Sequence, residues 1–75
     1  MIKVDLHGMR HEDVRKVVIR AIEDAWNSGE TIDFITGHSL HMKSIVTEVL
    51  DEYKLGFQIG DYIGINQGFI RTIVD

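Results

Sequence analysis

The fold of this chain is decided by its N-terminal stretch, Ile2-Lys3-Val4-Asp5-Leu6-His7-Gly8. Apolar and polar residues alternate there, which is the period-two pattern of a strand with one buried face. The pattern predicts that Val4 and Leu6 point into the core, while Asp5 and His7 share the opposite face. Gly8 then allows the backbone to turn where a residue with a Cβ atom would be strained. We therefore expect a short strand that ends in a carboxylate, an imidazole and a turn.

Two amphipathic helices are predicted downstream of this strand. The first runs from about His11 to Ser28 and ends at Gly29, and the second runs from about His41 to Lys54 and ends before Gly56. Ser39 is the candidate N-cap of the second helix. Both follow the i, i+3, i+4, i+7 spacing of an apolar stripe. The stripes contain Val14, Val17, Val18, Ala21, Ile22 and Ala25 in the first helix, and Met42, Ile45, Val46, Val49, Leu50 and Tyr53 in the second.

Three further strands complete the predicted order β-α-β-α-β-β. Thr31 to Thr36 is β-branched and aromatic and lies between glycines, as is typical of a strand. Phe57 to Tyr62 and Gly68 to Val74 indicate a hairpin, with residues 64–67 as its linker. A β-α-β unit implies a right-handed crossover and parallel pairing of its strands. We therefore predict an α/β fold, a two-layer sandwich in which both helices cover one face of a four-stranded mixed sheet.

Composition indicates one small globular domain spanning residues 1–75. Hydrophobic residues make up 44% of the 75 residues and charged residues 27%, and the absence of cysteine excludes disulfides and thiolate zinc sites. The sequence shows no apolar signal core and no apolar run approaching the ~20 residues of a membrane span. We expect a cytoplasmic protein without a membrane partner. The oligomeric state stays open.

Basic residues and histidines gather in two short segments, although the chain as a whole is acidic. The net charge of −4 argues against tight, non-specific binding of nucleic acid. However, all four histidines fall in two short segments, Gly8 to His11 with the preceding His7, and Gly37 to His41. If the first two strands are parallel neighbours, these loops meet at the carboxyl edge of the sheet. Both loops lead into helix N-termini, which suit a phosphate or sulfate anion.

At these residues the chain resembles the small MutS-related (Smr) domain family. Val4-Asp5-Leu6-His7-Gly8 is similar to the family's leading Leu-Asp-Leu-His-Gly motif. Phe34-Ile35-Thr36-Gly37 lies where the family has an apolar strand ending in His-Gly-Lys-Gly-x-Gly, and Asn66-Gln67-Gly68-Phe69-Ile70-Arg71 resembles its glycine-rich entry into the last strand. The resemblance covers essentially the whole chain. It implies a sandwich like the C-terminal domain of a bacterial translation initiation factor, DNA or RNA as partner and, in some members, endonuclease activity.

The second motif departs from the family pattern. Thr36 stands where the family has a histidine, His38 replaces the lysine, and Ser39 and His41 replace glycines, so that only Gly37 is retained. The first motif keeps its aspartate and histidine unchanged.

The leading hypothesis is therefore a nucleic-acid-binding Smr-like domain that acts as a DNA-nicking or RNA-cleaving endonuclease, a hydrolase. Its candidate catalytic residues are Asp5, His7 and His38, since phosphodiester hydrolysis needs an activated nucleophile and a protonated leaving group. The candidate nucleic-acid-binding residues are Gly8, Arg10, His11, Gly37, Ser39, His41 and Lys43.

Three alternatives stay open at this point. The domain is a non-catalytic adaptor for nucleic acid or protein, or a binder of small phosphorylated molecules, or the polar residues serve only to satisfy turns and solvated loops. The sequence indicates no particular cofactor. A divalent metal held by Asp5, His7, His38 and His41 stays conceivable, without a recognised ligand spacing. Trp26 is expected in the core or at an interface rather than as a base-stacking platform.

Overall fold

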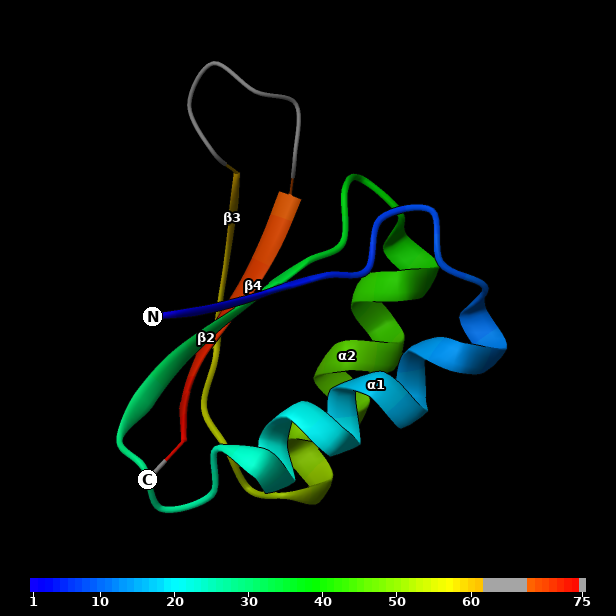
Figure 1. Cartoon of the computed structure of the whole chain (residues 1–75). Coiled ribbons are helices and arrows are strands. Elements are labelled where there is room, and N and C mark those ends of the chain that lie inside the picture. The colour runs from blue at the N-terminus through cyan, green and yellow to red at the C-terminus, as the bar shows by residue number, and fades with distance from the viewer. Residues whose placement is uncertain (62–67, 75) are drawn as a thin grey trace.

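The computed structural model describes residues 1–61 and 68–74, and the predicted order of elements is confirmed (Figure 1). The elements are β1 (Ile2–Asp5), α1 (His11–Asp24), β2 (Glu30–Ile35), α2 (Leu40–Glu52), β3 (Gln58–Asp61) and β4 (Gly68–Val74). The sheet has the order β1-β2-β4-β3, with β1 parallel to β2 and the other pairs antiparallel. Both helices lie on the same face of this sheet. The predicted linker at residues 64–67 lies outside the described residues, as does Tyr62.

The core lies between the sheet and the helices. Its centre is Phe34 of β2, the largest fully buried side chain, with Leu6 beside the end of β1. The predicted apolar stripes supply the helical side of the core. The buried helix residues are Val14, Val18, Ile22, Met42, Val46, Val49 and Leu50, and the turn after α1 adds Ala25. Burial of these apolar side chains is the main driving force available to a chain of this size.

β1 is two residues shorter than the pattern of alternation, which runs to His7, suggests. The strand ends at Asp5, and the amide of Leu6 makes one more bond, to the carbonyl oxygen of Ile35 at 2.9 Å. The amide of Met9 then donates to the carbonyl oxygen of Leu6 at 3.0 Å, which closes a turn. His7 therefore lies in this turn and not on the strand. The prediction that Asp5 and His7 share a strand face is wrong for that reason.

Helix α1 ends earlier in the chain than the predicted Ser28. The helix ends at Asp24, and Asn27 with φ of +60° takes the left-handed conformation expected of the glycine. Gly29 lies directly before β2, with φ of +73°, and its amide donates to the carbonyl oxygen of Val74 at 2.8 Å. Gly29 thus turns the chain into β2 and does not cap α1.

The end of α2 is a Schellman motif built on a lysine. The amide of Leu55 donates to the carbonyl oxygen of Leu50 at 2.9 Å, and the amide of Lys54 donates to that of Asp51 at 3.0 Å. In this motif the residue after the cap adopts a left-handed conformation, usually as glycine. Here that residue is Lys54, with φ of +57°, and not the predicted Gly56.

Charged pairs join the elements outside the core. Arg15 of α1 donates to both carboxylate oxygens of Glu52 of α2, at 2.6 and 2.9 Å, and this pairing holds the pKa of Glu52 below its usual value. On the sheet face opposite the helices, Arg71 of β4 makes a bidentate pair at 2.7 and 2.9 Å with Asp33 of β2, whose side chain is fully buried. A bidentate guanidinium satisfies both oxygens of such a buried carboxylate.

Neither of the two helices in the described part of the chain has the length and apolar character of a membrane span.

Replacing Lys54 with glycine should stabilise the domain. Glycine adopts positive φ without the steric cost that a Cβ atom adds, so we expect the free energy of unfolding to rise by about 0.5–1 kcal/mol. Urea denaturation measures the change. Asn27→Gly is the matched control, because asparagine already tolerates this conformation, and it should change stability by only a few tenths of a kcal/mol. Equal effects of the two substitutions would contradict the assignment of strain to Lys54.

Candidate functional site

The turn between β1 and α1 is built by Asp5 and Gly8. The Oδ1 atom of Asp5 accepts a hydrogen bond from the backbone amide of His7 at 2.9 Å. Gly8 has φ of +81° at the third position of the Leu6-to-Met9 turn, as is typical of a type II turn. The carboxylate therefore fixes the backbone that carries His7. The imidazole of His7 is exposed.

His7 lies directly against the loop between β2 and α2. Gly37, buried and with φ of +65°, is so close to His7 that a Cβ atom at position 37 would lie 2.8 Å from Cδ2 of the imidazole. A real Cβ atom does not approach another heavy atom so closely, and positive φ disfavours any side chain there. Two independent constraints therefore favour glycine at position 37: its left-handed backbone conformation, and the imidazole of His7, which leaves no room for a Cβ atom. The predicted meeting of the two loops is confirmed.

A second contact joins the first turns of the two helices. The rings of His11 in α1 and His41 in α2 have centroids 4.1 Å apart, with an angle of 68° between their planes. Both imidazoles are exposed. The N-termini of α1 and α2 therefore lie side by side, as the neighbouring blue and green segments in Figure 1 show.

The two helix N-termini differ in how they are capped. Ser39 caps α2 as predicted, because its Oγ atom accepts from the amide of Met42 at 3.2 Å. Arg10 occupies the N-cap position of α1 and makes no side-chain cap hydrogen bond within the described part of the chain. The acidic side chains of Glu12 and Asp13 lie in the first turn of α1. They partly offset the positive end of the helix dipole there.

Thr36 is tied to the backbone beneath the two loops. Its side chain is 2% exposed, and its hydroxyl lies 3.1 Å from the carbonyl oxygen of Gly37 and 3.4 Å from that of Gly68. The carbonyl oxygen of Gly68 also accepts from the amides of Thr36 and Gly37, at 2.9 and 3.1 Å. The start of β4 thus holds the β2–α2 loop in place. This position carries a hydroxyl, which is not an acid–base group at neutral pH.

These loops surround a surface depression of about 440 Å³. Six predicted site residues line it, together with Met9, Thr36 and Met42, which were not predicted as site residues. The six are His7, Gly8, His11, Gly37, His38 and Ser39. We call this surface the two-loop depression.

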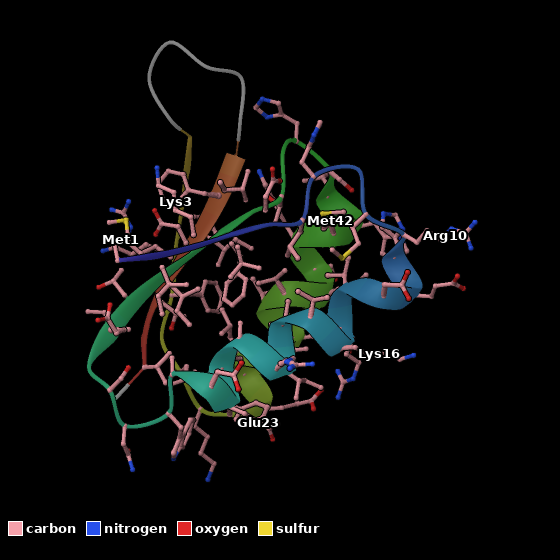
Figure 2. The ribbon with its side chains drawn as sticks, in the orientation of Figure 1. Met1, Lys3, Arg10, Lys16, Glu23 and Met42 are labelled. Carbon is pink, nitrogen blue, oxygen red and sulfur yellow. The ribbon has the colours of Figure 1, made fainter. Side chains whose placement is uncertain are left out.

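Four predicted residues do not line the two-loop depression. Asp5 acts through the backbone of His7, and His41 reaches the site through its contact with His11. Arg10 points outward from the start of α1, with Nη1 3.4 Å from Oε1 of Glu12 (Figure 2). Lys43 lies one residue beyond Met42 on α2, and its side chain is partly exposed. Among the residues that the structure describes, no three histidine, aspartate or glutamate side chains are arranged to hold a metal ion.

Gly68 supports the site through its carbonyl oxygen, a role that the sequence does not predict. The sequence shows Gly68 only as part of the glycine-rich entry into the last strand. Its role follows from the strand order, since β4 lies next to β2 although 32 residues separate Thr36 from Gly68. Met42 was predicted as part of the apolar stripe of the second helix, and no role was predicted for Met9.

A comparison with models of known protein families adds the identity of the domain. The model of the Smr domain matches residues 4–62, well over half of the chain, and covers both loops of the depression. The chain belongs to the Smr domain family. No curated protein and no solved structure matched the chain. The family is generally associated with binding of nucleic acids and with nuclease-like activity. In this Smr domain the leading Asp-Leu-His-Gly motif forms the β1–α1 turn described above.

The contact between Gly37 and His7 yields a direct test. In Gly37→Ala the new Cβ atom should displace the imidazole of His7, and the domain should lose at least about 1–2 kcal/mol of stability. The matched control is Gly29→Ala. Gly29 has a similar φ of +73° but no atom within 4 Å of its Cβ direction.

We expect both variants to be destabilised in urea, and only Gly37→Ala to shift the NMR resonance of the His7 Cδ2 proton. If that resonance moves equally in both variants, the contact between the two loops is not as described.

Proposed function

We propose that this Smr domain binds the sugar–phosphate backbone of a nucleic acid at the two-loop depression. The observation that carries the proposal is the packing of His7 on Gly37, which places two helix N-termini at one surface. Helix N-termini present unpaired amide groups and a positive dipole end, both of which favour anions. The imidazoles of His7, His11 and His38 line the same surface and add N–H donors.

The cations at the rim favour a polyanion over a single phosphate. Arg10, at the N-cap position of α1, and Lys43, in the first turn of α2, lie outside the depression. The ion pair between Arg10 and Glu12 is 3.4 Å long and strongly exposed, so it contributes little to stability and can be exchanged for a phosphate. Ser39 retains its hydroxyl proton for donation, because its Oγ atom only accepts from the helix. Successive phosphates of one strand would follow this edge.

Cleavage of the bound strand is the second candidate function. The exposed imidazole of His7 is held by a backbone that Asp5 fixes, and a second imidazole, that of His38, lines the same depression. One imidazole would accept the proton of the attacking hydroxyl or water, and the other would donate a proton to the leaving oxygen. In this arrangement Asp5 positions His7 and does not contact the substrate.

A non-catalytic adaptor is the alternative, supported by Thr36. Its hydroxyl is buried and bonded to backbone carbonyls, so this position supplies no acid–base group. Binding and cleavage therefore need separate experiments.

Binding is tested by fluorescence anisotropy with labelled single-stranded RNA and duplex DNA. Arg10→Ala should weaken binding and lower the slope of log K against log salt by about 1, as expected for the loss of one phosphate contact. The control is Arg20→Ala, which removes the same charge from the other end of α1, where Arg20 is paired with Asp24 at 3.9 Å. Equal losses in both variants would show that the depression is not the binding surface. Competition by nucleoside monophosphates at low concentration would favour a small-molecule site instead.

Cleavage is tested with the same two substrates under saturating protein. If the domain is an endonuclease, His7→Ala should lower the single-turnover rate at least about 100-fold while the affinity changes far less. His38→Ala should lower the rate similarly, and Arg20→Ala should retain it. Equal cleavage by all variants would assign the activity to a contaminant, and binding without any cleavage by the wild type would establish the adaptor.

A further inference from the structure

A second hollow lies at the other end of the helical layer. Glu23 near the end of α1, Trp26 in the turn that follows it, and Tyr53 at the end of α2 line a depression of about 340 Å³. Figure 2 shows Glu23 at the opposite end of α1 from Arg10. We call this surface the aromatic pocket. It shares no residue with the two-loop depression.

The aromatic pocket combines two ring faces with one carboxylate. The rings of Trp26 and Tyr53 have centroids 5.9 Å apart and planes inclined at 62°, so they form two walls of a corner. The hydroxyl of Tyr53 donates to Oε2 of Glu23 at 3.4 Å. Trp26 is 47% exposed, so it is not a core residue. The half-exposed indole therefore leaves ring surface open to a partner beside a second ring.

The charges around the pocket favour a cation. Glu52 is paired with Arg15 and Asp24 with Arg20, whereas Glu23 is bonded to a phenol. Burial and the nearby Glu23 carboxylate raise the pKa of Tyr53. A neutral phenol carries no positive charge, so its hydrogen bond leaves the charge of Glu23 in place. Neither helix has a basic residue in its last turn, and Lys54 lies two residues beyond the end of α2. The negative ends of two helix dipoles therefore add to the negative potential here.

We propose that the aromatic pocket binds a lysine or arginine side chain of a partner protein. A cation over the face of an indole or phenol ring is attracted by the ring quadrupole, and the carboxylate of Glu23 adds a charge-assisted hydrogen bond. The same carboxylate and helix ends repel phosphates. The pocket therefore does not extend the nucleic-acid surface, and the domain carries a protein-binding site at the end opposite to it.

The test uses Trp26, the only tryptophan of the chain, as the probe. Its fluorescence is followed while unstructured glycine–serine peptides containing four lysines or four arginines are added, with a glutamine peptide of the same length as reference. We expect a saturable change of emission with the cationic peptides and none with the glutamine peptide. Glu23→Gln should weaken binding of the peptide about five- to tenfold.

Asp24→Asn is the matched control, because it removes the same charge from the neighbouring residue, which does not line the pocket. It should change the affinity less than about twofold. Equal losses in the two variants would reduce the effect to general electrostatics and overturn the proposal. Calorimetry with Trp26→Ala, checked for its fold by circular dichroism, must show loss of peptide binding.

Two further titrations distinguish other occupants. Tetramethylammonium binding as tightly as the peptides would indicate a small organic cation instead of a protein side chain. An RNA oligonucleotide that quenches Trp26 and loses affinity in Trp26→Ala would indicate a base-stacking surface. Either result would overturn the assignment.

Discussion

The parallel pairing of β1 with β2 is the constraint on which the rest of the structure depends. It matches Asp5 with Ile35 and continues through the bond from the amide of Leu6 to the carbonyl oxygen of Ile35. Because the strands are parallel and in this register, they end at the same level, and the loops that follow them meet. Without this pairing His7 would not reach Gly37, and the N-termini of α1 and α2 would not be neighbours.

The sequence was sufficient to predict elements in which one local signal dominates. Periodicity placed both helices and the first strand, and β-branched and aromatic content between glycines placed the second strand. These patterns failed where tertiary contacts decide. Gly29 was predicted to cap the first helix, but its amide bonds to Val74 of β4, and the left-handed residues that follow α1 and α2 most closely are Asn27 and Lys54. The residue pattern alone does not show which of several neighbouring residues adopts the left-handed backbone conformation that ends a helix.

The candidate site follows the same division. Grouping the histidines by loop was sufficient to predict that His7, His11, His38 and Gly37 come together, because the topology fixes where each loop lies. A role of Asp5 in holding the turn was among the readings that the sequence left open, and its bond to the amide of His7 agrees with that reading. The sequence did not show that Gly68 supports Gly37 from another strand. Nor did it show that the guanidinium of Arg10, at the rim of the depression, faces Glu12. Side-chain direction is set by the turn geometry, which composition does not encode.

The two ends of the helical layer differ in the charge that they attract. At one end helix N-termini and imidazoles favour phosphate, and at the other end helix C-termini and Glu23 favour a cation. We expect nucleic acid to occupy the first of these ends. A ¹H–¹⁵N NMR titration of the domain with a short single-stranded oligonucleotide tests this expectation. The amide resonances of Gly8, His11, Gly37 and Lys43 should shift and saturate together, whereas shifts confined to the Arg71 and Ile73 face of the sheet would contradict binding at the two-loop depression.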